Sequence, residues 1–186
     1  MSPDQLHEPW RSFLHDLDAA LTTPTELHCL GGFIAAELYG LRRPTADVDV
    51  LEAIGTSPDE LMRLAGPGSG RHRRYRVHLQ MVGGIASVPE DYQSRLVDLC
   101  QGTFRKLRVR ALEKHDLVLA KLPRNSDRDR EDFQEIARNV GLDADLLRDR
   151  YHDELRLHLS NPARDDLTLD LWLDILKEVA DRRSEG

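Results

Sequence analysis

Two aspartates stand one residue apart in the segment DVDVL, residues 47–51. Side chains two apart in a strand point to the same face, so Asp47 and Asp49 project together while Val48 and Val50 point the other way. Two adjacent carboxylates repel each other unless a cation lies between them. Mg²⁺ binds carboxylate oxygens together with substrate phosphates, and such sites activate attacking hydroxyl groups. The pair indicates a metal site; the alternative is a surface strand with two exposed aspartates.

A glycine pair precedes these aspartates. Gly31 and Gly32 follow the apolar run at residues 26–30 and come before a helical pattern at residues 33–40. A turn without Cβ atoms lets backbone amides approach a phosphate, and the following helix N-terminus favours negative charge. Two glycines also suit an ordinary tight turn. However, a strand, a glycine pair, a helix and an Asp-x-Asp strand in this order form a rarer combination, and it predicts one phosphate and metal site.

The elements that must position these residues follow from hydrophobic periodicity. Period-two or continuous apolar patterns predict strands at residues 26–30, 47–51, 75–82 and 105–112. Spacing of three and four predicts helices at residues 6–21, 33–40, 58–65, 113–122, 130–140, 143–159 and 167–183. This pattern predicts an α+β fold, a mixed β-sheet flanked by helices with a helical C-terminal part. We expect one domain over residues 1–140 and a helical extension over residues 141–186, packed on the same core.

Composition limits the class of protein. A chain of 186 residues with 40% hydrophobic residues can bury one sizeable core. The N-terminus shows no signal-peptide pattern and no apolar run is long enough for a membrane span, so a cytoplasmic location without membrane contact is expected. Cys29 and Cys100 lie in apolar surroundings and are expected to be buried thiols. The formal net charge is -7, but residues 71–130 are net basic, which suits phosphate binding.

The stretch LGGFIAAELYGLRRPTADVDVL resembles the nucleotidyltransferase superfamily. More narrowly, it is similar to small bacterial nucleotidyltransferase-like proteins related to the AbiE-type toxins, including the family DUF6036. The residues that carry this resemblance are Gly31, Gly32, Arg43, Thr45, Asp47, Asp49 and Lys121. The later string RDREDF, with Arg128, Asp129 and Asp132, resembles the RDxxD element of AbiE-like enzymes. The resemblance covers about residues 26–140.

The resemblance implies an NTP substrate, Mg²⁺ or Mn²⁺ as cofactor, and transfer of a nucleoside monophosphate to an acceptor hydroxyl. The acceptor would be RNA such as tRNA, or a protein, and the chain would act as the toxin of a toxin–antitoxin pair with an antitoxin protein as partner. Asp47, Asp49, Lys121 and Asp132 would be catalytic, and Asp47 and Asp49 would hold the metal. Nucleotide binding would fall to Gly31, Gly32, Arg43, Thr45 and Lys121. The residue-level alternatives are a surface lysine at position 121 and a capped, salt-bridged helix start at residues 124–132.

One departure from the superfamily pattern concerns the third carboxylate, which is expected on a later strand. The strand at residues 75–82 offers His78 and Gln80 instead. His78 would bind a metal through a neutral nitrogen or serve as a hydrogen-bonded structural residue, and Asp132 would otherwise supply the missing ligand from its helix. The alternative function is therefore a catalytically inactive nucleotide- or RNA-binding module with the same fold.

Two basic elements are candidates for contacts with nucleic acid or phosphate. The string RHRRYR at residues 71–76 is expected in a loop and brings four arginines together, and the strand at residues 105–112 carries three basic residues on one face. These residues are Arg71, Arg73, Arg74 and Arg76 in the first element, and Lys106, Arg108 and Arg110 in the second. The alternative is that they are solvated charges on a loop and on a sheet edge, where charge resists aggregation.

Overall fold

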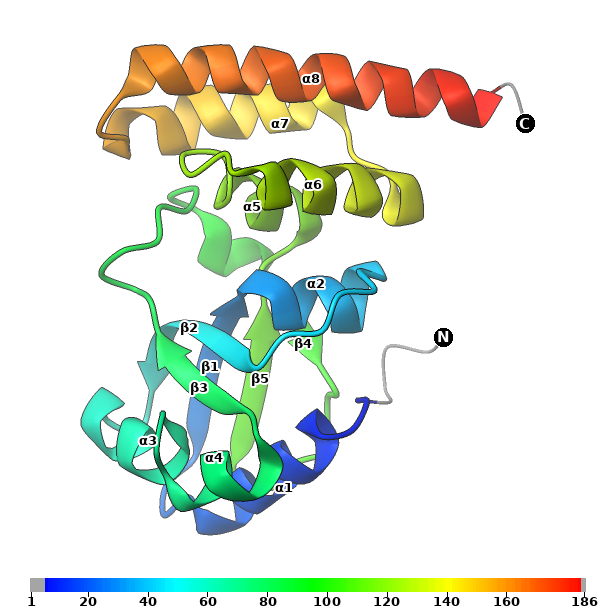
Figure 1. Ribbon diagram of the computed structural model, residues 1–186. Coiled ribbons are helices and arrows are strands. Elements are labelled where there is room, and N and C mark those ends of the chain that lie inside the picture. The colour runs from blue at the N-terminus through cyan, green and yellow to red at the C-terminus, as the bar shows by residue number, and fades with distance from the viewer. Residues whose placement is uncertain (1–5, 185–186) are drawn as a thin grey trace. The chain divides into compact units, whose positions relative to one another are not determined.

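A computed structural model describes residues 6–184, which fold into two compact units (Figure 1). The first unit consists of Met1–Leu38, Arg42–Ala86 and Leu96–Leu112, and the second of Tyr39–Leu41, Ser87–Arg95 and Glu113–Gly186. The expected domain boundary after residue 140 stays a prediction.

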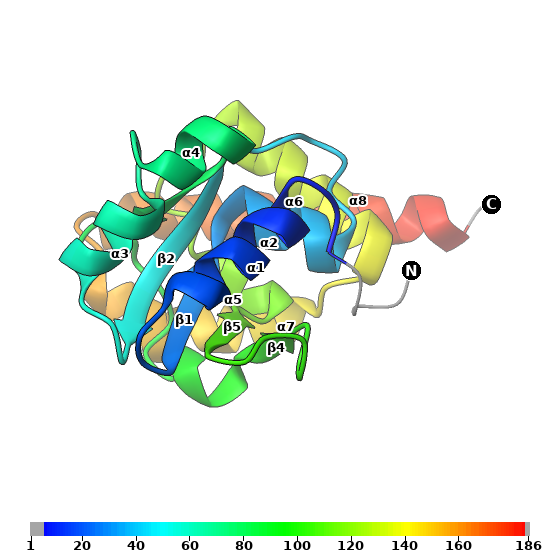
Figure 2. The ribbon, with the colours of Figure 1, turned by 90° about the horizontal axis from the view of Figure 1, so that it is seen from below.

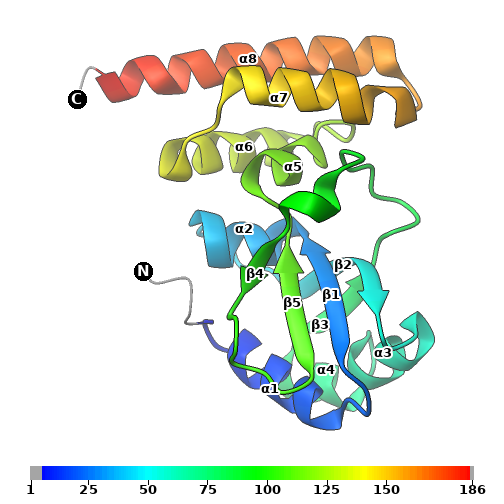
Figure 3. The same cartoon turned by 180° about the vertical axis from the view of Figure 1, so that it is seen from behind.

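The first unit is built on a five-stranded mixed sheet in the order β3-β2-β1-β5-β4. The strands are β1 (Thr25–Leu30), β2 (Asp47–Ile54), β3 (His78–Met81), β4 (Val97–Leu99) and β5 (Leu107–Ala111). Strand β1 pairs antiparallel with β2 and parallel with β5 (Figure 3). Strand β3 is parallel to β2 and forms one edge, while β4 is antiparallel to β5 and forms the other. The predicted mixed sheet flanked by helices is confirmed.

Four helices belong wholly or largely to this first unit. They are α1 (Trp10–Ala20), α2 (Gly31–Tyr39), α3 (Pro58–Ala65) and α4 (Gly70–Tyr75). Helices α1, α3 and α4 gather on the sheet (Figure 2). The apolar stripe of α1, with Phe13, Leu14 and Leu17, is fully buried, as are Leu27 of β1 and Leu79 of β3. Burial of apolar surface stabilises the packing of these helices on the sheet, by about 25 cal/mol for each Å² removed from water.

The second unit is helical among its described residues. It contains α5 (Lys114–Leu119), α6 (Asp127–Val140), α7 (Ala144–Arg150) and α8 (Pro162–Ser184), with short turns η1 (Tyr92–Arg95), η2 (Tyr151–Leu155) and η3 (Arg156–His158). The rings of Phe133 and Trp172 pack with centroids 4.6 Å apart in its core. Ser126 and Asp129 form a capping box that starts α6.

The structure corrects three sequence-based expectations about elements. Residues 70–75 form α4 instead of a loop and strand start, because Ser69 caps the helix by accepting from the His72 backbone N–H. Strand β4 and the turn η1 were not predicted, since three residues are too few to show a period. The helix expected at residues 143–159 changes after Arg150 into a π-helical turn and a 3₁₀ turn. Cys29 and Cys100 are both buried, as expected.

Among the helices in residues 6–184, none combines the length and apolar character needed to cross a membrane.

Asp18 joins α1 to the start of β5. Asp18 is 7% exposed, and its carboxylate accepts from the backbone N–H groups of Arg105, Lys106 and Leu107, with the last two at 2.7 Å. Burial raises the pKa of Asp18, but these three hydrogen bonds outweigh burial and hold the pKa below its ordinary value. The charged carboxylate is therefore a structural acceptor for three backbone donors.

We predict that Asp18→Ala lowers the free energy of unfolding by about 2 to 4 kcal/mol, because it leaves buried N–H groups without an acceptor. The control Asp170→Ala, at an exposed position on α8, should change it by less than about 0.5 kcal/mol. Urea denaturation measures both. Because the pKa of Asp18 is lower in the folded state than in the unfolded state, the parent should lose this stability as the pH falls below about 4. The difference in free energy of unfolding between the parent and Asp18→Ala should therefore become smaller. A difference in free energy of unfolding that stays constant from pH 7 to pH 3 would contradict this role of Asp18.

Candidate functional site

The two aspartates lie on one face of β2, as their spacing predicts. Asp47 and Asp49 are half-buried, whereas Val48 and Val50 on the opposite face are 1% and 0% exposed. Because the valines are fixed in the core, the aspartates cannot exchange faces without moving the strand by one residue. Strand β2 therefore presents both carboxylates on the same side of the sheet.

The glycine pair lies directly against these residues. Strand β1 ends at Leu30, whose register partner on β2 is Asp49, and α2 begins at the next residue, Gly31. A Cβ on Gly31 would lie 2.0 Å from Oδ2 of Asp49, and Gly31 has a φ of +81°. Only glycine satisfies both conditions, because other residues avoid this backbone region and would collide with the carboxylate. The first glycine is required by the position of Asp49.

Thr45 ties the second glycine to Asp47. A Cβ on Gly32 would lie 3.3 Å from the Cβ and Oγ1 of Thr45. The Thr45 hydroxyl donates to Oδ1 of Asp47 over 2.6 Å, a short bond of the kind that charged acceptors form. Thr45 therefore orients the Asp47 carboxylate. Arg43 is half-buried two residues earlier in the same segment.

These carboxylates suit a hard divalent cation. Mg²⁺ is bound by one or two carboxylates and completes its six ligands with water and phosphate oxygens. Asp47 and Asp49 provide such oxygens, and the start of α2, where backbone N–H groups favour an anion, lies directly against Asp49. Within residues 6–184, no group of three or more His, Cys, Asp or Glu side chains is placed to hold a metal ion. The donor set therefore fits a metal that takes further ligands from a substrate.

Strand β3 stands beside β2 without a carboxylate. His78 is the register partner of Asp47, and Gln80 that of Asp49. Nδ1 of His78 is buried and makes no hydrogen bond with any part of the chain that the structure describes, and the His78 ring lies 4.7 Å from the ring of His72. Burial lowers the pKa of His78 and the charge of His72 adds to this, although Asp47 acts in the opposite direction. His78 is thus biased toward the neutral ring, the form that coordinates metals.

Lys121 and Asp132 form an ion pair inside the second unit. Nζ of Lys121 lies 2.7 Å from Oδ2 of Asp132 and 3.7 Å from Oδ1 of Asp129. Lys121 is 7% and Asp132 is 2% exposed, so Lys121 is a buried lysine with an anionic partner. Burial raises the pKa of Asp129, but hydrogen bonds from Arg124 and Ser126 outweigh it and lower the pKa to about 2. The catalytic and nucleotide-binding roles expected for this pair stay predictions.

The four arginines at residues 71–76 lie on or directly after α4. Arg71 donates to the Leu64 carbonyl and to Asp16, so it is held within the fold. Arg73 and Arg74 are exposed on the helix, and Arg76 is its exposed C-cap. The arginines of this segment therefore differ in how freely they could contact a ligand, a difference that the sequence does not reveal.

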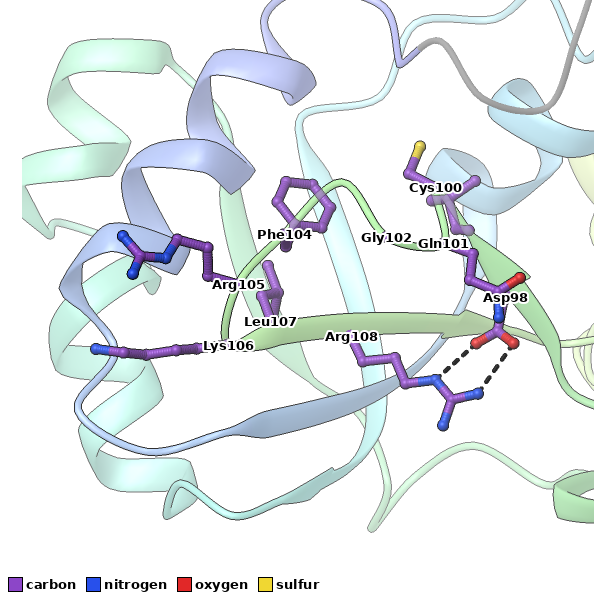
Figure 4. Close-up of a pocket in the computed structure, with 10 residues that line it drawn as sticks. Asp98, Cys100, Gln101, Gly102, Phe104, Arg105, Lys106, Leu107 and Arg108 are labelled. Carbon is purple, nitrogen blue, oxygen red and sulfur yellow. Dashed lines mark hydrogen bonds and ion pairs between the residues drawn. The ribbon is translucent and has the colours of Figure 1, made fainter.

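The basic residues of the other element have partners within the first unit. β5 lies between β1 and β4, so it is an inner strand and not a sheet edge. Arg108 donates to Asp98 at 2.8 and 3.0 Å, Arg110 donates to the Leu96 carbonyl, and Lys106 donates to the Leu21 carbonyl. A pocket of about 230 Å³ lies beside this strand, but the Arg105 and Lys106 side chains point away from its Asp98 side (Figure 4). Phosphate contacts by Lys106, Arg108 and Arg110 stay predictions.

Sequence reasoning missed Asp16, which organises the arginine segment. Its carboxylate accepts from Arg71 and, over 2.9 Å, from the Tyr75 hydroxyl. Burial raises the pKa of Asp16, yet these hydrogen bonds and nearby arginine charges hold it below its ordinary value. The partners are 55 and 59 residues away along the chain, so no local pattern could have revealed them.

A glycine pair at a helix start, packed against a strand that presents two aspartates on one face, is the arrangement expected of a nucleotidyltransferase. The family model described as nucleotidyltransferase of unknown function (DUF6036) matches residues 15–178. The chain belongs to this family, and the resemblance noted from its sequence is confirmed. Neither the curated proteins nor the solved structures gave a match.

We predict that Gly31→Ala destabilises the protein more than Gly68→Ala does. Both glycines have φ near +80°, but a Cβ at Gly68 meets no atom within 4 Å, whereas at Gly31 it meets the Asp49 carboxylate. Gly68→Ala should therefore cost only the backbone strain of about 1 to 2 kcal/mol, and Gly31→Ala about 1 to 3 kcal/mol more. Urea denaturation measures both variants. Equal losses would show that Asp49 does not press on Gly31.

We predict that Lys121→Met lowers the free energy of unfolding by about 3 to 5 kcal/mol, because it leaves the Asp132 carboxylate buried without its cation. The double variant Lys121→Met, Asp132→Leu should recover much of this loss, since both charges are then absent. Lys177→Met removes an exposed pair with Asp174 and should cost less than about 1 kcal/mol. Thermal and urea denaturation check the series. A loss for Lys121→Met no larger than that for Lys177→Met would contradict a buried pair.

Proposed function

We propose that the protein transfers a nucleoside monophosphate from an NTP to an acceptor hydroxyl in a metal-dependent reaction. The observation that carries this proposal is the position of the Asp49 carboxylate against Gly31. It brings a metal-binding oxygen and a backbone suited to phosphate to the same point. An NTP substrate and a divalent cation also agree with membership of the nucleotidyltransferase family.

In this proposal, different residues of the first unit bind the triphosphate and the cation. Gly31 and Gly32 let the triphosphate approach the start of α2, where backbone N–H groups and the helix dipole favour negative charge. Asp47, oriented by Thr45, and Asp49 hold the cation. Bound there, Mg²⁺ or Mn²⁺ would neutralise charge on the phosphates and help the acceptor hydroxyl lose its proton. The acceptor oxygen bonds to the α-phosphorus as the bond to the leaving pyrophosphate breaks.

Further parts of the proposal rest on family resemblance. Nucleotide contacts by Arg43 and Lys121 and a catalytic role for Asp132 come from the motif match, as does the choice of RNA such as tRNA, or a protein, as acceptor. A toxin role with an antitoxin partner and a cytoplasmic location complete the physiological side of the proposal.

A second candidate function is a nucleotide- or RNA-binding module without catalysis. The observation that favours it is the edge strand β3, where His78 and Gln80 occupy the positions beside Asp47 and Asp49. A cation held by only two protein carboxylates is bound weakly in the absence of substrate. Metal binding that depends on NTP would therefore suit either function, and only turnover separates them.

We predict that the protein transfers radiolabel from an α-labelled NTP to total tRNA or to protein in the presence of Mg²⁺ or Mn²⁺. Asp47→Asn, Asp49→Asn should lower this transfer by about 100-fold or more, because the cation then has no carboxylate ligand. Asp59→Asn, an exposed position on α3, serves as the matched control and should retain activity.

Three outcomes have definite meanings. Transfer that is lost in the double variant and kept in the control supports the enzyme. An absence of transfer by the parent, with metal-dependent NTP binding in calorimetry, supports the binding module instead. Equal transfer by the double variant and the parent contradicts the assignment of Asp47 and Asp49.

A further inference from the structure

The stretch from the second half of α3 to a few residues beyond β3 carries positive charge and no acidic residue of its own. Residues 61–89 contain five arginines and two histidines but no aspartate or glutamate, in a chain of net charge -7. The stretch includes α4 and β3, and β3 is the edge strand beside the aspartate-bearing β2 (Figure 1). A local concentration of one sign of charge attracts ligands of the opposite sign.

The arginines of α4 separate into one that is held in the fold and three that are exposed. Arg71 has a side chain only 17% exposed and is bound to Asp16. Arg74 is 72% exposed, with a longer contact of 3.5 Å to Asp16. Arg73 is exposed and reaches the Gly68 carbonyl. Arg76 is exposed and makes no side-chain hydrogen bond or ion pair within residues 6–184. We call Arg73, Arg74 and Arg76 the α4 arginine patch.

Arg76 occupies its position at a conformational cost. It has φ +62° in the left-handed region and closes α4 as its C-cap. Glycine is the residue that usually follows a helix in this conformation, because a Cβ is disfavoured there. Backbone strain at a residue whose side chain has no partner within residues 6–184 points to function.

The patch borders the strand that bears the candidate site. The His78 backbone N–H donates to the Ala46 carbonyl over 3.0 Å, and His78 is the register partner of Asp47. Arg76 precedes His78 by two residues, and the rings of His72 and His78 are 4.7 Å apart, which joins α4 to β3. A ligand on the patch therefore lies at the N-terminal ends of β2 and β3, where Asp47 is placed.

We propose that the α4 arginine patch binds the phosphodiester backbone of a nucleic acid, which is the acceptor of the transfer proposed above. Guanidinium groups match phosphate oxygens in planar, two-pronged hydrogen bonds. The Tyr75 ring cannot add base stacking, because Arg74 lies 5.2 Å above it, Phe13 packs against it and its hydroxyl is bound to Asp16. Binding is therefore carried by backbone charge and tolerates different base sequences. This inference rests on the proposed function for its acceptor role, but not for binding itself.

The test compares binding of a fluorescent, mixed-sequence single-stranded RNA by the parent and two triple variants. Arg73→Gln, Arg74→Gln, Arg76→Gln removes the patch, whereas Arg11→Gln, Arg148→Gln, Arg182→Gln removes the same charge from exposed arginines that pair with nearby acids. The patch variant should bind at least about 10-fold more weakly, and the slope of log affinity against log salt should fall by about 2, at about 0.7 for each lost phosphate contact. The control variant should keep most of the RNA affinity and most of the salt slope of the parent.

Calorimetry with Mg²⁺ and NTP shows whether the patch binds the phosphates of RNA or the triphosphate of the NTP. The patch variant should bind NTP as the parent does; an equal loss of NTP and RNA affinity would overturn the inference and assign the arginines to the triphosphate. RNA affinity equal to that of the parent would overturn it as well, as would tighter binding of a poly-glutamate peptide than of RNA by the parent. Asp47→Asn, Asp49→Asn should still bind RNA, so a failure of transfer does not mimic a failure of this inference.

A single variant tests whether a loss of RNA binding could instead result from misfolding. Arg76→Gly relieves the left-handed backbone and should raise the melting temperature while it weakens RNA binding. A stable Arg76→Gly variant with undiminished RNA affinity and an unchanged salt slope would count against Arg76 as a contact.

Discussion

At the end of β1, the Asp49 carboxylate occupies the space that a side chain on residue 31 would need. The pairing of Leu30 with Asp49 places these segments together, and the positive φ of Gly31 turns the chain from β1 into α2. Strand register, helix start and carboxylate position thus depend on the same contact. A Cβ at residue 31 would disturb all three, because the backbone and the carboxylate have no independent freedom there.

The charges of the two units follow different physical rules. On β2 the valines buried on one face hold both aspartates on the other, so apolar packing offsets the repulsion between two carboxylates. A cation would relieve that repulsion. In the second unit, Lys121 and Asp132 already neutralise each other at 2.7 Å, so their charges are satisfied without a ligand. The aspartates of β2 are therefore the stronger basis for a ligand site.

The sequence was informative where a local rule sets the structure. Alternation placed Asp47 and Asp49 on one face, and Ser57, a residue type that favours helix N-caps, caps α3 by accepting from the Glu60 backbone N–H. It was uninformative where distant contacts decide. Arg76 reads as part of an alternating strand but adopts a left-handed conformation that ends α4. Asp18 is bound to the backbone 87 to 89 residues away, a pairing that no short window can contain. The burial of Lys121 likewise depends on α6 and not on its own neighbours in sequence.

A crystal structure of the protein with Mn²⁺ and a non-hydrolysable NTP analogue tests the central claim most directly, because the anomalous signal of Mn²⁺ locates the cation. We predict an anomalous peak within about 2.0 to 2.3 Å of carboxylate oxygens from both Asp47 and Asp49, with the phosphates over Gly31 and Gly32. A nucleotide and cation bound elsewhere, with both carboxylates unliganded, would contradict the account.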